Sequence, residues 1–241
     1  MANSHYLEGI PGLNIARGPV KGADFIHKFG AVPAMSQNTA GSVWDKNDTL
    51  YPWSAFDTAG ILVAAQANVS DNGKKVTVLG LDSDYAPISE EFTLSGTGTV
   101  NGTKIFKRVY RAYMTDGSNV GNVSFSRGGV EVLRITEGKS QTLMAIYTVP
   151  AGYTAYLTKG VCTCQAGADA TGDMFIRYNG QSSFRVGHSF EVSGTGGEYL
   201  YEFSVPIAIP EKSDIDIRAR VRSNNARVAA AFDMILIENN V

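Results

Sequence analysis

The sequence predicts an all-β protein with two antiparallel β-sandwich domains, the C-terminal one resembling a jelly roll, preceded by an extended N-terminal arm. The chain is 44% hydrophobic and 18% charged with 26 glycines, a composition that suits short strands and tight turns. Many short runs alternate polar and apolar residues, which is the period of a half-buried strand, and clusters of Gly, Asn, Asp and Ser separate them. The expected divisions are residues 1–41 for the arm, 42–138 for the first sandwich and 139–241 for the second.

The charge and hydropathy of the chain argue against several classes of partner. The net charge is −2 and the pI is about 5.9, so no basic surface is expected to neutralise phosphates, and nucleic acid is not an expected partner. Apolar runs such as Ile61–Ala65 are too short to span a membrane, so no membrane partner is expected. The first residues, Met-Ala-Asn-Ser-His, lack the features of a signal peptide, which predicts synthesis in the cytoplasm.

The two cysteines, Cys162 and Cys164, are expected to be buried, reduced thiols. At positions i and i+2 of a strand they face the same side and are too close in sequence for a relaxed disulfide. A metal site would need further ligands, and the three histidines His5, His27 and His188 lie far away in the sequence.

Residues 1–41 are interpreted as an arm because Gly9, Pro11, Gly30, Pro33 and others interrupt every apolar group before a helix or strand can form. Such a segment cannot bury a core alone. Its large apolar side chains predict that it docks on its own body or on a neighbour, and a disordered terminus is the alternative. The side chains expected to make this contact are Leu7, Ile10, Leu13, Phe25 and Phe29.

The first sandwich is expected to begin with an aromatic cluster, Trp44, Tyr51 and Trp53, flanked by carboxylates. These rings either cover the end of a sheet, which is favoured because aromatic side chains dominate core burial, or form a platform for sugar rings. Asp82-Ser83-Asp84 is interpreted as a turn because the full pattern of a calcium loop is absent. The expected strands are Gly60–Ala67, Lys74–Leu79, Ser89–Leu94, Lys104–Met114, Asn122–Ser126 and Val130–Thr136.

The second sandwich is expected to start after Glu137-Gly138-Lys139-Ser140. Its short alternating runs fit a two-sheet jelly roll. His188 falls on the apolar side of one run, which favours a core or interface histidine with a satisfied ring over a catalytic one. The runs before the C-terminal stretch are Thr142–Val149, Thr154–Gln165, Met174–Tyr178, Phe184–Val192 and Tyr199–Val205.

The C-terminal stretch Ser213–Ile237 has the pattern of a hairpin, with two alternating arms around Ser223-Asn224-Asn225. The register that pairs apolar residues with one another sets Arg222 opposite Arg227 and Asp216 opposite Asp233. Because like charges across a sheet are unfavourable, these side chains are either splayed and solvated, or they meet a partner with compensating charges. The second alternative makes three arginines candidates for an assembly interface: Arg218, Arg220 and Arg222.

No motif for catalysis or cofactor binding is found. A Gly-rich phosphate loop, a nucleophile elbow and a zinc-protease helix are all absent from the sequence. The acidic pair Glu90-Glu91 points to opposite faces of a strand, unlike the paired carboxylates of a glycosidase. The sequence therefore offers no recognisable catalytic, cofactor or metal site, and a hydrolase built from distant residues is the weakest alternative.

Five stretches carry a family resemblance that spans nearly the whole chain: Ile26–Ser36, Val43–Trp53, Val76–Thr97, Gln141–Gly160 and Phe203–Glu238. Together they resemble virion structural proteins of tailed bacteriophages, particularly phages of cyanobacteria. The resemblance implies a protein without enzyme activity or cofactor that is made in the host cytoplasm and assembles with other virion proteins. It does not imply a position in the particle.

The expected function is an accessory or decoration (cement) protein of the capsid exterior, which assembles through its arm and its β domains. A homo-oligomer, with three subunits as the expected number, follows from an apolar-rich chain with few charges. The alternative is a tail or fibre component that binds host carbohydrate through Trp44, Tyr51 and Trp53.

Overall fold

The computed structural model of the chain describes residues 11–46, 48–96, 98–193, 197–222 and 225–240. The fold is all-β with several antiparallel sheets, and the one α-helix among the described residues is the six-residue α1 (Pro11–Ala16). The all-β prediction is therefore confirmed. None of the described helical segments has the length and apolar character needed to cross a membrane.

An elongated lobe is formed by two sheets. Sheet A has the strand order β1-β16-β11-β14, and sheet B has the order β10-β15-β12-β13 with the short β2 also pairing with β15. β10 and β2 pair with different halves of β15, so together they complete one edge of sheet B. The strands are β1 (Ala23–Met35), β2 (Ala40–Ser42), β10 (Ile146–Thr148), β11 (Tyr153–Cys164), β12 (Ala170–Arg177), β13 (Arg185–Val192), β14 (Glu198–Ile209), β15 (Asp214–Val221) and β16 (Ala226–Glu238).

The core of this lobe lies between the two sheets. It forms because each strand turns alternate residues inwards, for example Ile217 of β15 and Phe232 of β16, which belong to one buried cluster. Cys162 and Cys164 lie on the inner side of β11 as buried free thiols, as predicted. Burial raises the pKa of the Cys162 thiol to about 12.

The predicted C-terminal hairpin is wrong, because its two arms lie in opposite sheets. β15 pairs with β10, β12 and β2, whereas β16 pairs with β1 and β11. Two strands that face each other across a core show the same apolar alternation as two strands side by side, so the pattern located the faces but not the partners. Asp216 is paired with Ile146 and Phe175 and not with Asp233. The expected turn residues 223 and 224 lie outside the described residues.

The expectation that no strand forms before residue 42 is also wrong. β1 pairs with β16 from Ala23, opposite Ile237, to Val32, opposite Val228. Gly30 does not break this strand; a Cβ there would lie 2.3 Å from the Ala145 nitrogen, so the glycine allows the chain to pass close to β1. The register shifts only after Val32, next to the proline at position 33.

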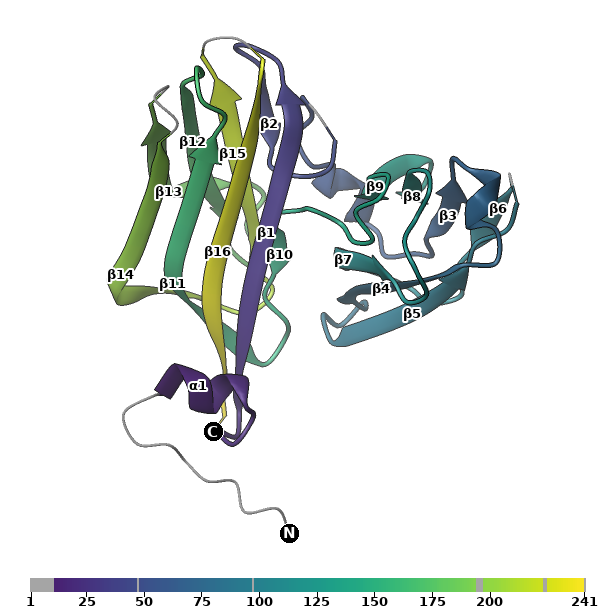
Figure 1. Cartoon of the computed structure of the whole chain (residues 1–241). Helices are drawn as coiled ribbons and strands as arrows, with labels where there is room; N and C mark the ends of the chain where they lie inside the picture. The colour runs from purple at the N-terminus through teal and green to yellow at the C-terminus, as the bar shows by residue number, and fades with distance from the viewer. Residues whose placement is uncertain (1–10, 47, 97, 194–196, 223–224, 241) are drawn as a thin grey trace.

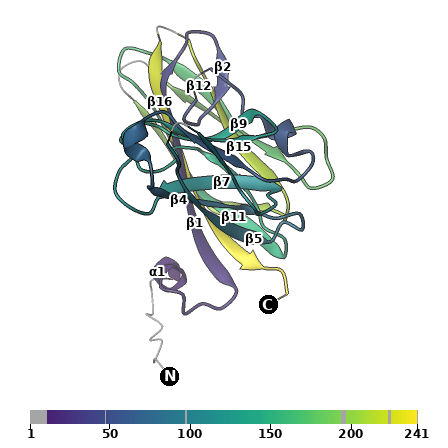
Figure 2. The same ribbon diagram turned by 90° about the vertical axis from the view of Figure 1, so that its right-hand side faces the viewer.

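A smaller lobe is inserted between β2 and β10 and lies beside the sandwich (Figures 1 and 2). It has two sheets, β6-β3-β8-β9 and β5-β4-β7, around a separate core that includes Phe56, Phe106 and Phe125. Its elements are η1 (Trp53–Phe56), β3 (Val63–Gln66), η2 (Val69–Asp71), β4 (Lys75–Leu81), β5 (Pro87–Thr93), β6 (Thr99–Asn101), β7 (Arg108–Met114), β8 (Val123–Arg127) and β9 (Val130–Ile135). Apart from the short β6, these strands correspond to those expected over residues 60–136.

Candidate functional site

The outer face of sheet A is left open by the smaller lobe, which lies beside the sandwich (Figure 1). Strand register arranges the side chains of this face in three rows that cross all four strands. The first apolar row contains Phe25, Ile235, Tyr156 and Ala208; the charged row contains His27, Asp233, Lys159 and Glu202; and the second apolar row contains Phe29, Ala231, Val161 and Leu200.

The charged row places acidic and basic residues next to each other from β1 to β14. His27 Nδ1 lies 2.5 Å from the Asp233 carboxylate, and Lys159 Nζ lies 3.5 Å from the Glu202 carboxylate. A bulge in β11 leaves Thr158 without a register partner and brings Lys159 opposite Asp233. The side chains at the two ends of the row, His27 and Glu202, are 50% and 72% exposed. The row therefore presents acidic and basic side chains in alternation to any partner on this face.

The two apolar rows flank the charged row. Phe25 and Leu200, at opposite corners of the face, are 42% and 48% exposed, and their row neighbours are half-buried or exposed. Apolar side chains grouped on one open sheet face are typical of an interaction surface. Of the arm residues expected to make contacts, Phe25 and Phe29 lie on this face. Leu13 is exposed in α1, and Leu7 and Ile10 lie outside the described residues.

A second partly exposed aromatic group lies where the edge strands β13 and β14 approach each other. His188 Nε2 lies 2.8 Å from the hydroxyl oxygen of Tyr199, and its ring packs on Tyr201 and Phe203. The Nε2 atom of His188 thus has a hydrogen-bond partner within the chain. The pairing of β14 with β11 is interrupted after Glu202, and Val205 in the interruption is 80% exposed.

The outer face of sheet B is partly covered by the smaller lobe through a buried ion cluster. Arg108 of β7 donates from Nε and Nη2 to the two carboxylate oxygens of Asp214, at 2.8 and 3.0 Å. Arg177 of β12 donates to Asp214 Oδ2 from the opposite side, at 2.5 and 3.0 Å. Asp214 is buried, and Thr148 also donates to it, so one carboxylate ties together both lobes.

The aromatic residues expected either to close a sheet or to bind sugar belong to this junction. Trp44, Tyr51 and Trp53 are only 1%, 3% and 6% exposed, which leaves no ring face free for a sugar. Trp53 Nε1 donates to Asp216 at 3.1 Å, and its ring lies beneath Arg108. The first interpretation, burial at the end of a sheet, fits this arrangement.

The three arginines proposed for assembly have different surroundings. Arg218 donates to Asp216 at 2.8 Å and stacks on the Phe175 ring, so its charge is already compensated within the chain. Arg222 lies 3.6 Å from Glu191. Arg220 is exposed and lines a hollow together with the exposed Leu50.

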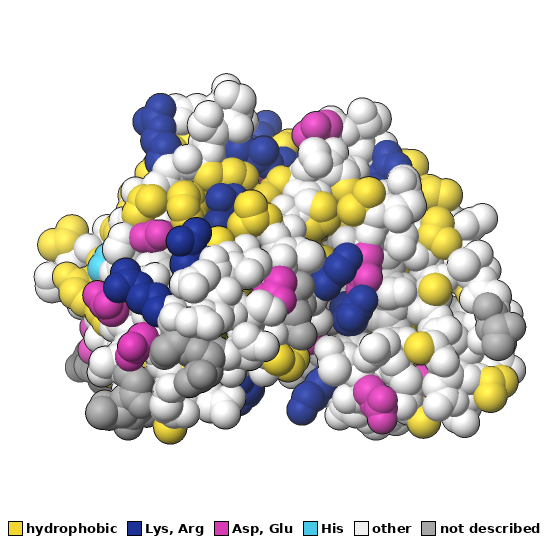
Figure 3. All heavy atoms as spheres, turned by 90° about the horizontal axis from the view of Figure 1, so that it is seen from above, with side chains coloured by type: hydrophobic (Ala, Val, Ile, Leu, Met, Phe, Trp, Pro, Cys, Tyr) yellow, Lys and Arg dark blue, Asp and Glu magenta, His cyan; other side chains and the backbone are white. Residues whose placement is uncertain are grey.

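An open cleft of about 450 Å³ lies between the lobes next to Asp214. Its lining includes Tyr85, Lys107, Asn179 and Lys212. Tyr85 and Lys212 have φ values of 65° and 59°, a left-handed conformation that costs roughly 1–3 kcal/mol in non-glycine residues. On the face of the molecule seen from above, Figure 3 shows basic and acidic side chains interspersed and no extended field of one sign.

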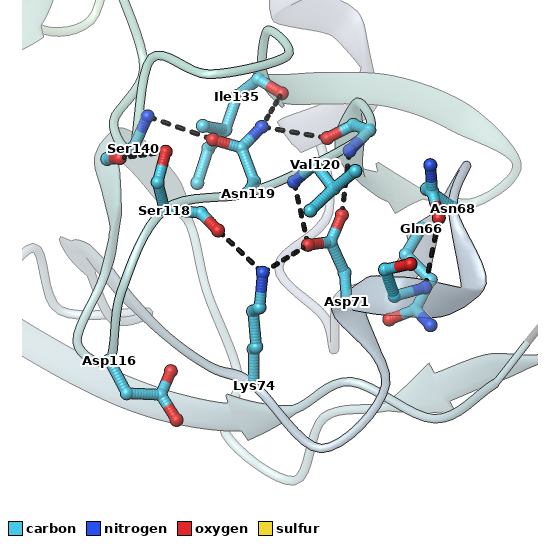
Figure 4. Close-up of polar contacts among 12 residues, drawn as sticks. Gln66, Asn68, Asp71, Lys74, Asp116, Ser118, Asn119, Val120, Ile135 and Ser140 are labelled. Carbon is cyan, nitrogen blue, oxygen red and sulfur yellow. Dashed lines mark hydrogen bonds and ion pairs between the residues drawn. The ribbon is translucent and has the colours of Figure 1, made fainter.

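A polar network inside the smaller lobe was not foreseen from the sequence (Figure 4). The buried carboxylate of Asp71 accepts hydrogen bonds from the backbone of Val120 and Gly121 and from Lys74 Nζ, at 2.7 to 2.8 Å. The neighbouring Asn119 side chain accepts from the Ser140 backbone and donates to three carbonyl groups. With these bonding groups occupied inside the protein, the network is suited to holding loops in place.

The described residues contain no group of three or more His, Cys, Asp or Glu side chains that could hold a metal ion. Asp82 and Asp84, considered for calcium, form a turn in which the Asp82 side chain accepts from the backbone of Asp84 and Ala86, at 2.9 Å each.

Comparison with known proteins gives only distant similarities. No family model and no curated protein matches the chain. Among solved structures, a protein of infectious bursal disease virus strain Gx is similar with a TM-score of 0.30 and 11% identity, over 91% of this chain and 73% of that one. Naturally occurring empty particles of cowpea mosaic virus give a TM-score of 0.22 and 9% identity, over 76% and 85%. The VP2 subviral particle of infectious bursal disease virus gives 0.23 and 9%, over 91% and 72%. TM-scores this low do not establish a shared fold.

Proposed function

We propose that this chain is a virion structural protein without enzyme activity. The observation that carries the proposal is the strand order of the elongated lobe. Numbered along the chain from one to eight, its main strands form the sheets 1-8-3-6 and 2-7-4-5, with β2 as an extra edge piece. This is the order of a jelly roll, an architecture common in viral coat proteins and also found in lectins and cupins.

Because one architecture serves several functions, the choice among them rests on the surfaces. The described residues offer an open sheet face with two apolar rows, whereas their buried polar clusters hold the chain together. The resemblance of five stretches to phage virion proteins agrees with this choice. The protein is proposed to act as an accessory or decoration protein of the capsid exterior, in contact with other virion proteins and with copies of itself.

The test is the presence of the protein in purified particles. Mass spectrometry of gradient-purified virions should detect it at a fixed copy number, and gold-labelled antibodies should mark the head in negative-stain micrographs. Labelling of the tail would instead support the alternative, a tail or fibre component. Absence from washed particles, with the protein abundant in the infected cell, would contradict the proposal.

A tail or fibre component that binds carbohydrate is the second candidate, and the cleft between the lobes is the observation that favours it. Its volume is in the range of small-ligand sites, and it combines the Tyr85 ring with polar side chains such as Asn179 and Gln181. Binding on a glycan array that disappears in Asn179→Ala and persists in Trp44→Phe would support this candidate. Absence of glycan binding by the wild-type protein would remove it.

A further inference from the structure

The order of charges on the outer face of sheet A predicts which molecule covers it. From β1 to β14 the charged row consists of a histidine, an acid, a base and an acid: His27, Asp233, Lys159 and Glu202. Its two central residues, Asp233 and Lys159, carry opposite charges. Reading the row from the opposite end gives the reverse order of signs, so the row is complementary to its own reversed copy.

A second copy of the chain can meet this face about two kinds of two-fold axis. An axis parallel to the strands keeps each row on itself and reverses its direction. Asp233 then faces Lys159 of the partner subunit, and His27 faces Glu202 of the partner subunit. An axis parallel to the rows keeps their direction, so Asp233 faces Asp233 of the partner subunit. Like charges at a buried interface are unfavourable, so only the first axis is compatible with the row.

The apolar rows fit the same arrangement. Under the axis parallel to the strands, the first apolar row packs on its own copy, with Ile235 facing Tyr156 of the partner subunit. The second apolar row does the same, with Leu200 facing Phe29 of the partner subunit. Apolar burial then supplies the affinity, and the charged row between them fixes the orientation.

We propose that the outer face of sheet A binds the same face of a second copy about a two-fold axis parallel to its strands. This self-association would be one way in which the proposed virion protein assembles, and its biological role rests on that proposed function. The self-association itself is measured on the purified chain, so its failure is distinct from absence of the protein from virions.

The test uses sedimentation equilibrium with two single charge reversals, Asp233→Lys and Lys159→Asp. In each homodimer the facing pairs carry like charges, so the dimerisation constant should weaken at least tenfold. In an equimolar mixture the two variants can form a heterodimer, in which the lysines of one subunit face the aspartates of the other at both positions. The mixture should therefore regain wild-type affinity. Lys139→Asp, an exposed charge reversal in the smaller lobe, should leave the dimer unchanged.

Because Asp233→Lys also breaks the contact with His27, Leu200→Lys serves as a second variant at an exposed position. It should keep the wild-type melting temperature and weaken the dimer at least tenfold. A wild-type monomer at several hundred micromolar, a trimer, or a dimer that is insensitive to all three variants would overturn the proposal. A mixture that binds more tightly than the wild type would favour the axis parallel to the rows and overturn the axis proposed here.

Discussion

The two outer faces of the sandwich differ in how they are covered. The outer side of β15 in sheet B carries two buried carboxylates, Asp214 and Asp216. From the smaller lobe, Arg108 donates to Asp214 and Trp53 donates to Asp216. The outer side of sheet A carries charges that pair only along its own row, between two open apolar rows. Buried, networked charges hold one chain together, whereas partly exposed charges such as Asp233 and Lys159 remain available to a second chain.

The first prediction concerns the covered face and has the largest expected effect. Asp214→Ala should lower the free energy of unfolding by about 3–5 kcal/mol, because Arg108 and Arg177 lose their shared buried partner. Urea denaturation followed by circular dichroism measures this. The exposed Asp84→Ala should change the free energy by less than about 0.5 kcal/mol. Similar values for the two variants would show that the junction contributes nothing to stability.

The second prediction concerns pH and two buried groups where the lobes meet. Burial lowers the pKa of Lys28 to about 7, and burial raises the pKa of Asp45 to about 7. Lys28 donates to the Tyr110 carbonyl, and Asp45 accepts from the backbone of Leu143 and from Thr136.

Whether stability rises or falls with pH depends on which state, folded or unfolded, binds more protons. Between about pH 4 and 7 the folded state holds the extra proton on Asp45, so the contribution of Asp45 to stability falls as pH rises. Above pH 7 the unfolded state holds the extra proton on Lys28, so the contribution of Lys28 rises with pH. The combined contribution should have a minimum near pH 7. Urea midpoints across pH should flatten below 7 in Asp45→Asn and above 7 in Lys28→Met; unchanged profiles would show that these groups do not titrate in this way.

The third prediction compares the loss of a hydrogen bond to a carboxylate with the loss of one to a backbone carbonyl. Trp53→Phe should cost about 1–3 kcal/mol, because the buried Asp216 carboxylate loses a donor. Trp44→Phe, which removes a 3.2 Å bond to the Thr49 carbonyl, is the matched control and should cost less. Equal losses in urea melts would mean that the ring volume, and not the bond to Asp216, determines the effect.

The fourth prediction concerns the open face and has the smallest effect on stability. Leu200→Ser should change the monomer's free energy of unfolding by no more than about 0.5 kcal/mol, because nearly half of this side chain is already exposed. Leu133→Ser, at a fully buried position, should cost several times more. Thermal melts at a concentration where the protein is monomeric make the comparison. A large loss for Leu200→Ser would show that this face stabilises its own chain.

The sequence was sufficient for the class of the fold and for the faces of most strands. Alternation in β15 and β16 correctly marked Ile217 and Phe232 as inward-facing. It could not identify pairing partners, because a strand has the same inner face whether its sequence neighbour lies beside it or across the core. The rows on sheet A depend on register among four strands that are distant in sequence, so they became visible only in the structure.

The glycines and prolines of the first forty residues predict an arm instead of a strand for a related reason. In a local window they interrupt each apolar group, but Gly30 is needed where the two segments at Val43 and Ala145 pass close to β1. A local sequence window contains no information about a segment a hundred residues away. The junction around Asp214 was hidden in the same way, because its arginines come from β7 and β12, far from β15 in sequence.

The pairing of β1 with β16 has a consequence for synthesis. β1 is translated before β16, and it stays without this neighbour until residue 226 and those beyond have been made. The smaller lobe has its own core and its strands pair only with one another, so it can fold while the rest of the chain is still being made. Val32 and Met35, which are completely buried in the folded structure, gain this burial only when the sandwich forms. The long-range pairing thus means that the sandwich cannot close before β16 has been translated.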